Sequence, residues 1–266
     1  MSSSFKRIIS ALIFIPILSY CIFSTNSLLL LLLICLLIFL GLLEFYSLAS
    51  KKQVKPFKII GVITALLLAL GAYFKPTQFY LLSNLLMTPL LIGYIITLLT
   101  KRHFLEVGVT LSGVLYMGYL ASHIILLKHL PDGNFYLSLL FLITWSTDAI
   151  ALYIGLKFGR HKLVPKISPK KSVEGAVAGL IGAVLISIIV SLITKYISIN
   201  QAIILGLILG FFGQVGDLLE SKIKRMAEVK DSNTWIPGHG GILDVFDSVI
   251  FNAPIIYCYV FFSLNF

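Results

Sequence analysis

Charged side chains are scarce in this sequence, and acidic ones are the scarcest. Only 12% of the 266 residues are Asp, Glu, Lys or Arg, whereas 58% are hydrophobic. Soluble globular domains carry about 25% charged residues, so this composition excludes a soluble domain. The charges also fall between the apolar segments, which leaves no continuous polar face for a soluble helical bundle. The sequence therefore predicts an integral membrane protein.

Cysteine is rare too. Cys21, Cys35 and Cys258 each stand alone in an apolar segment, which excludes the paired spacing of a disulfide framework or a zinc site. The N-terminal stretch FKRIISALIFIPILSY has the basic and apolar parts of a signal peptide but lacks a small-x-small cleavage motif before the next apolar run. We interpret the cysteines as packing residues and the N-terminal stretch as an uncleaved first span.

Nine apolar segments have the length that a helix needs to cross a bilayer, about 17–25 residues. They are residues 8–24, 27–48, 57–74, 78–99, 105–127, 135–156, 173–194, 200–219 and 242–262. Their Leu-rich continuity differs from the short alternating strands of a membrane barrel. The predicted fold is therefore all-α, a polytopic membrane protein with about nine transmembrane helices.

The distribution of basic residues predicts the orientation of these helices. With the N-terminus in the cytoplasm, 18 of the 21 Lys and Arg residues lie inside, and Lys75, Lys128 and Lys195 lie outside. This asymmetry is the positive-inside pattern. Basic loops against anionic lipid explain the formal charge of +10 without a nucleic-acid partner. We expect a multi-pass protein of a bacterial inner membrane or its equivalent, with both charge-rich loops in the cytoplasm.

Acidic residues are unevenly distributed along the chain. Three of the 11 precede Asp148, and the other eight lie from there onward. We therefore expect one continuous membrane unit in which residues 1–134 form a scaffold and residues 135–266 carry the chemistry. Glu44, at the end of the second apolar segment, is interpreted as a structural residue that pairs with Lys51 or Lys52.

Two polar features precede the main one. Asp148 lies late in the sixth apolar segment, where an ionisable side chain is costly and marks a candidate site; helix packing is the alternative. In the following loop, Ser168 and Pro169 form a helix-start signal. Lys170 and Lys171 would then lie beside a helix N-terminus, which favours anions. Membrane anchoring under the positive-inside rule is the alternative for these lysines.

Residues 216–247 form the main polar feature, with six acidic residues, four basic ones and one His. One helical face carries residues at i, i+3, i+4 and i+7 spacing, namely Asp217, Glu220, Ser221 and Lys224. The glycine-rich stretch 237–241 can bring backbone N–H groups close to an anion, and Asp244 and Asp247 follow it. A solvated loop with i,i+4 pairs does not explain three aspartates beside apolar helix. Carboxylates at two helix ends, flanked by basic residues, suit a Mg²⁺ that also binds phosphate oxygens.

These residues carry a resemblance to a known family. GDLLESKIKR, KDS and PGHGGILDVFD resemble the signature of the phosphatidate cytidylyltransferases, and FGRHKLVPKISPKKSVEG resembles the block that precedes it. The match covers roughly residues 145–252. It implies an enzyme that transfers the cytidylyl group of CTP to phosphatidate, giving CDP-diacylglycerol and pyrophosphate in a Mg²⁺-dependent reaction. The implied partners are CTP, phosphatidate and membrane lipids, and a homodimer is compatible with this reading.

The resemblance also implies roles for individual residues. The metal ligands would be Asp217, Asp244 and Asp247, and the number of carboxylates permits a second cation such as K⁺. His239 would donate to phosphate or orient the loop. Phosphate groups would be neutralised by Lys170, Lys171, Lys224, Arg225 and Lys230. Substrate binding, or the orientation of neighbouring groups, would involve Asp148, Ser168, Ser221, Asp231, Gly240 and Gly241.

The chain departs from the family pattern at several positions. Val245 stands where the pattern has Arg between the last two aspartates. Around Asp148, the pattern's Thr, Tyr and Arg are replaced by Ala149, Leu152 and Leu156. Because these arginines are missing, reduced activity and an altered lipid headgroup site are both compatible with the sequence.

Two other functions are also compatible with these residues. One is a CTP-dependent enzyme that acts on an isoprenoid lipid, such as a polyprenol kinase or an archaeol cytidylyltransferase. The other is a transporter or ion channel in which Asp148, Asp217 and Asp244 line a pathway. A transporter should place ionisable residues near mid-membrane on several helices, whereas here they cluster towards one side.

Overall fold

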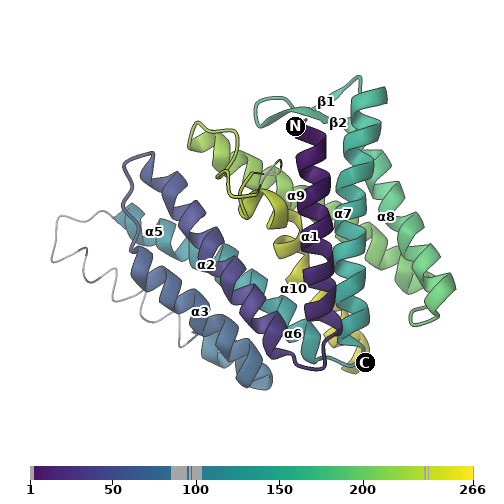
Figure 1. Cartoon of the computed structure of the whole chain (residues 1–266), viewed down its shortest axis with the longest axis horizontal. Helices are drawn as coiled ribbons and strands as arrows, with labels where there is room; N and C mark the ends of the chain where they lie inside the picture. Colours follow the sequence, from purple (N-terminus) through teal and green to yellow (C-terminus); the bar gives the residue numbers. More distant parts are fainter. Residues whose placement is uncertain are drawn as a thin grey trace.

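The computed structural model consists mainly of long apolar helices (Figure 1). It describes residues 3–84, 95, 97, 104–236, 238 and 240–265. The elements are α1 (Ser3–Phe23), α2 (Leu28–Ser50), α3 (Lys58–Phe74), η1 (Pro76–Gln78), α5 (Phe104–Gly113), η2 (Val114–Tyr119), α6 (Leu120–His129), α7 (Gly133–Phe158), β1 (Lys162–Val164), β2 (Ser168–Ser172), α8 (Val173–Thr194), α9 (Ile199–Met226) and α10 (Leu243–Asn265).

The helical membrane architecture is confirmed. Among the described residues, six helical segments are long and apolar enough to cross a bilayer, and α1 and α3 include shorter apolar stretches. Helices therefore occupy eight of the nine predicted spans. The remaining predicted span, residues 78–99, falls mainly outside the described part of the chain.

A small β-hairpin in the loop between α7 and α8 was not predicted. β1 and β2 pair antiparallel, with Lys162 opposite Ser172. The prediction that Ser168 and Pro169 begin a helix was wrong, because both lie in β2 and α8 begins after the N-cap Ser172. Proline disfavours helical geometry at the residue before it, which explains why Ser168 is extended. Lys170 and Lys171 therefore lie on a strand that leads into α8.

Helices α7 to α10 pack into a bundle through close approach and buried polar contacts. A Cβ added to Gly206 of α9 would lie 2.6 Å from the Cα of Val184 on α8. Small residues of this kind let membrane helices approach closely. Asn252 of α10 is buried and donates to Thr144 of α7 (3.0 Å) and to the carbonyl of Leu209 on α9 (2.9 Å). These bonds tie three helices together in the interior of the bundle.

The two charge-rich segments lie at the same end of the bundle. In Figure 1 the hairpin and the segment between α9 and α10 are both at the top, near the N-terminus, and the C-terminus is at the bottom. The Arg225 Nε, near the end of α9, donates to the Ile167 carbonyl between the strands at 3.1 Å. The loops thus share one side, as predicted. That this side is the cytoplasm stays a prediction.

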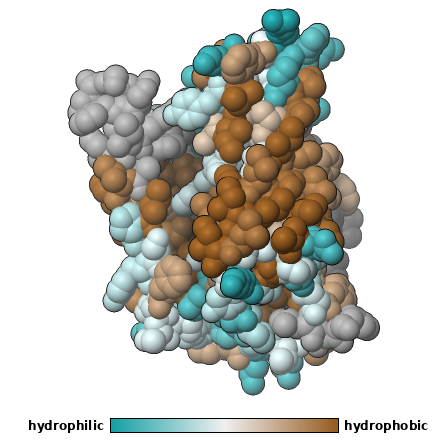
Figure 2. Space-filling model, turned by 90° about the vertical axis from the view of Figure 1, so that its right-hand side faces the viewer, coloured by the Kyte–Doolittle hydropathy of each residue, from teal (hydrophilic) through white to brown (hydrophobic). Residues whose placement is uncertain are grey.

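The surface of α8 has the character of a lipid-facing helix. Figure 2 shows a hydrophobic belt across the middle of the face it displays, with hydrophilic residues above and below. On α8, Ile181, Leu185 and Ile193 are each more than half exposed. Large apolar side chains in contact with water would favour aggregation, whereas in lipid they are at no disadvantage. The belt therefore marks the hydrocarbon layer.

The close contact at Gly206 gives a stability prediction. Gly206→Ala should lower the free energy of unfolding by about 1–3 kcal/mol, because the added methyl group meets backbone atoms of α8 that can move only if the helices separate. Thermal unfolding of the purified protein in detergent measures the change. Gly108→Ala is the matched control, since its Cβ would meet nothing within 4 Å. Equal midpoints for the two variants would contradict the packing of α8 on α9.

Candidate active site

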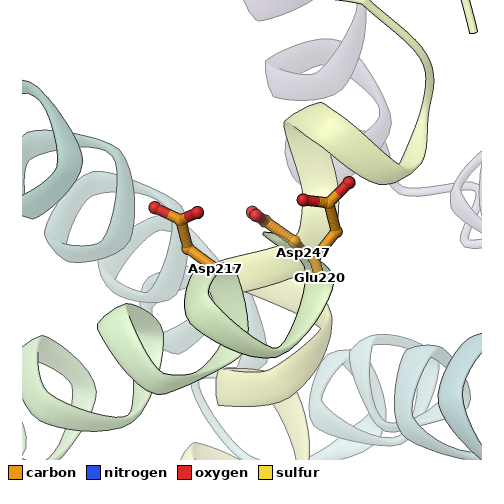
Figure 3. Close-up of side chains that lie close together, drawn as sticks. All are labelled: Asp217, Glu220 and Asp247. Carbon is orange, nitrogen blue, oxygen red and sulfur yellow. The ribbon is translucent and has the colours of Figure 1, made fainter. Parts of the chain in front are cut away.

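Three carboxylates from α9 and α10 converge at the charged end of the bundle. Asp217 and Glu220 lie one turn apart on α9 and face Asp247 of α10 (Figure 3). One oxygen from each of the three side chains lies within 4.8 Å of the others. Glu220 and Asp247 are buried, and Asp217 is partly exposed. We call these three residues the acidic cluster.

The acidic cluster has the chemistry of a divalent-cation site. Buried carboxylates this close repel one another unless a cation neutralises them. Glu220 Oε1 and the hydroxyl of Tyr116 are buried without a hydrogen-bond partner among the described residues. Tyr116 lies on η2. Oxygen ligands of this kind are those that Mg²⁺ takes, together with substrate phosphates, so the cluster fits such an ion.

Two lysines are held against these carboxylates. Lys171 of β2 is 2.6 Å from Asp217 Oδ2, so the hairpin delivers one cation to the edge of the cluster. Lys224, one turn after Glu220 on α9, lies 2.7 Å from Glu220 Oε2 and 2.5 Å from Asp244 Oδ1. Glu220 and Lys224 thus form an i,i+4 ion pair, as in the alternative of a loop with such pairs, but the same glutamate also belongs to the acidic cluster.

Asp244 is surrounded by hydrogen-bond donors of the protein. Its Oδ2 accepts from the backbone N–H of Gly241 (2.7 Å) and from both the N–H (2.9 Å) and the hydroxyl (2.8 Å) of Ser232. Its Oδ1 accepts a hydrogen bond from the Lys224 ammonium group. Gly240, which precedes Gly241, pairs with Ile236 through two backbone hydrogen bonds. Asp244 is not one of the three residues of the acidic cluster, and its role as a metal ligand stays a prediction.

Glu44 does not make the contact that the sequence suggested. Its carboxylate accepts from the start of α10, whereas Lys52 pairs with Glu228 just after α9. The Lys52 ammonium beside Glu228 lowers the pKa of that exposed carboxyl. The pairing of Glu44 with Lys51 or Lys52 was therefore wrong.

A cavity of about 1160 Å³ joins the charged groups to an apolar wall. Its charged lining consists of Asp148, Lys170, Lys171, Asp217, Glu220, Lys224, Asp244 and Asp247. Among the described residues that line the cavity, carboxylates outnumber lysines by five to three. The apolar wall includes Ile13, Phe14, Trp145, Leu152 and Tyr153, from α1 and α7. Ser168 and Val245 also line the cavity.

The other predicted site residues lie around this cavity or outside the described residues. Ser221 is buried and donates to Asp217 Oδ1 at 3.4 Å. Arg225 is exposed and holds the Ile167 and Val229 carbonyls. Lys230 and Asp231 lie on the segment after α9, and both are exposed. His239 falls outside the residues that the structure describes.

Comparison with known proteins identifies the family. The sequence profile of the cytidylyltransferase family matches residues 5–263. The chain belongs to the cytidylyltransferase family. Phosphatidate cytidylyltransferase of Staphylococcus saprophyticus is 34% identical over 257 residues, 94% of both chains. The protein of the same name from Bacillus subtilis is 32% identical over 229 residues, 82% of this chain and 84% of its own. The family resemblance is confirmed, and it reaches well beyond residues 145–252.

Removing one buried carboxylate tests the cation site without any substrate. Asp247→Asn should raise the unfolding midpoint measured in EDTA, because it removes one repelling charge. Mg²⁺ should raise the wild-type midpoint by at least about 2 °C and leave that of the variant unchanged, since only a bound ion stabilises by mass action. The control is Asp132→Asn, which precedes α7 at the opposite end. An equal Mg²⁺ shift in all three proteins would contradict a site at the acidic cluster.

Proposed function

We propose that this protein is a phosphatidate cytidylyltransferase, which transfers the cytidylyl group of CTP to phosphatidate and releases pyrophosphate. One observation supports the proposal: the cavity is lined by the acidic cluster and lysines as well as by an apolar wall along α1 and α7. A membrane lipid with a phosphate headgroup would place its phosphate beside the charged groups and its acyl chains against the apolar wall. Relatives of that name align over nearly the full chain.

The reaction needs positioning more than proton transfer. A phosphate oxygen of phosphatidate attacks the α-phosphorus of CTP, forming a new P–O bond. The bond from that phosphorus to the oxygen bridging the β-phosphorus breaks, and pyrophosphate leaves with the electron pair. The attacking phosphate is already ionised near neutral pH, so catalysis consists mainly of alignment and charge neutralisation. This agrees with a cavity lined by carboxylates and lysines.

The residues of the acidic cluster would hold Mg²⁺. When bound, the ion supplies neutralisation of phosphate oxygens. Lys171 is positioned by Asp217 at the mouth of the cluster, and Lys224 is positioned by Glu220 and Asp244. Both ammonium groups can turn towards a triphosphate, because Lys has three donors on a flexible stem. A second cation such as K⁺ remains compatible with the five carboxylates.

The lipid would lie against the apolar wall. Phe14 of α1 and Trp145 of α7 are in edge contact, with ring centroids 6.5 Å apart, and both line the cavity. Leu152 and Tyr153 continue the wall along α7 with exposed side chains. Acyl chains packed against this wall would leave the lipid phosphate at the charged end of the cavity. We assign this end to the cytoplasm, because the soluble substrate CTP is found there. None of the relatives described above is named as an isoprenoid-lipid enzyme or a transporter, so neither alternative is proposed.

The function is tested with purified protein, CTP, Mg²⁺ and phosphatidate in mixed micelles. We expect CDP-diacylglycerol and pyrophosphate in equal amounts, no product after EDTA treatment, and recovery on adding Mg²⁺. Absence of a CDP-lipid from phosphatidate, with a relative active in the same assay, would contradict the proposal. A polyprenol acceptor in a parallel reaction tests the isoprenoid alternative.

The site assignment makes a separate prediction. Asp217→Asn and Asp244→Asn should each lower kcat by about 100-fold or more, because each loses a charge that positions a lysine against the substrate phosphates. Elution as folded protein in size-exclusion chromatography is the control for structural damage. Near-normal rates in both variants would refute the site.

A further inference from the structure

Glu44 reaches the active-site segment from a distant part of the chain. It lies on α2 and is 1% exposed. Its Oε1 accepts from the N–H of Ile242 (2.9 Å), and its Oε2 accepts from the N–H of Leu243 (3.0 Å) and the hydroxyl of Ser232 (2.8 Å). A carboxylate from the first apolar half is therefore bonded to the loop and helix start that carry Asp244.

These bonds make Glu44 a cap for α10 supplied by another helix. The first N–H groups of a helix have no partner within it, and a buried one without a partner is costly. Ile242 and Leu243 are themselves buried, so water cannot easily take that role. A negative charge at a helix N-terminus is also favourable. Glu44 thus fixes where α10 begins and how it is oriented.

The contact continues from Glu44 to the acidic cluster. The Ser232 hydroxyl lies 2.8 Å from Glu44 Oε2 and also 2.8 Å from Asp244 Oδ2. A hydroxyl has one proton to donate, so it serves one carboxylate at a time and couples the two. Asp244 in turn forms an ion pair with Lys224, and Lys224 forms a second ion pair with Glu220 of the acidic cluster. The chain of contacts is therefore unbroken from α2 to the proposed metal site.

The packing around Gly241 leaves little freedom in this arrangement. A Cβ at Gly241 would collide with both carboxylate oxygens of Glu44 and with the Ser232 hydroxyl. The backbone of the glycine-rich loop therefore lies directly on the Glu44 carboxylate. Movement of that carboxylate would shift the loop and, through it, the N–H group that Asp244 accepts from Gly241.

We propose that Glu44 is a positioning residue for the cytidylyl transfer. It belongs neither to the acidic cluster nor to the lining of the cavity. It holds the start of α10 so that Asp244 and Lys224 stand correctly beside the acidic cluster. This role rests on the proposed function and assigns the first half of the chain a part in the reaction.

The test compares Glu44→Gln, Ser232→Ala and the double variant in the full-length protein. Glu44→Gln removes the charge and one acceptor oxygen with almost no change of volume. We expect kcat per folded molecule to fall about 10–100-fold and the Mg²⁺ concentration for half-maximal activity to rise, as for other residues that orient metal ligands. The double variant should be little worse than the worse single variant, because both act through one network.

The matched control is Glu106→Gln, another buried glutamate of the first half, which should keep wild-type kinetics. Two further readouts need no turnover. In Glu44→Gln, the amides of Ile242 and Leu243 should exchange hydrogen faster than in the wild type, and thermal unfolding should show the Mg²⁺ midpoint moved to higher concentration.

Wild-type values of kcat, amide exchange and Mg²⁺ midpoint in Glu44→Gln would overturn the inference. A loss confined to the yield of folded protein, with normal kcat per folded molecule, would also overturn it. If the wild type made no CDP-diacylglycerol, the proposed function would fail. The amide exchange and the Mg²⁺ midpoint would still show whether Glu44 positions the acidic cluster.

Discussion

The mutual repulsion of buried carboxylates is the constraint on which the charged end of this protein depends. Glu220 and Asp247 lie in an apolar bundle within a few ångströms of Asp217. Carboxylates in such surroundings are stable as ions only beside cations and donors. Lys224 is therefore held between Glu220 and Asp244, and Lys171 is brought to Asp217 by the hairpin. A divalent ion would offset the remaining repulsion between the carboxylates and could also bind the phosphates of a substrate.

The site draws on both halves of the chain. The acidic cluster belongs to α9 and α10, but α1 supplies part of the cavity wall, and η2 supplies Tyr116. Glu44 of α2 holds the helix start beside Asp244. The division into a scaffold of residues 1–134 and a catalytic region of residues 135–266 stays a prediction, and these contacts argue that the first part does more than support the second.

Much of the architecture could be predicted because its determinants are local. Apolar runs specify membrane helices, and the i, i+3 spacing of Asp217 and Glu220 is enough by itself to put both on one face of α9. The same spacing could have indicated Glu220 as a candidate metal ligand. An i,i+4 pair with Lys224, however, was enough to explain the presence of Glu220 without a metal ion. The motifs between residues 145 and 252 indicated the family correctly.

What could not be predicted depends on contacts between distant parts of the chain. Ser168 and Pro169 suit a helix start locally, yet pairing of β2 with β1 keeps them extended. The partners of Glu44 lie 188 to 199 residues away along the chain, so charges nearby in sequence, at Lys51 and Lys52, suggested the wrong partner. Asp244 looked equivalent to Asp217 in sequence, but only folding shows that Ser232, Gly241 and Lys224 surround it.

The position of the bound divalent cation tests this account most directly. Crystals grown with Mn²⁺ in place of Mg²⁺, measured at the manganese absorption edge, locate the ion by its anomalous scattering. The account predicts a peak about 2.0–2.2 Å from carboxylate oxygens of Asp217, Glu220 and Asp247. A peak away from these three carboxylates, or no peak at a Mn²⁺ concentration that supports turnover, would contradict it.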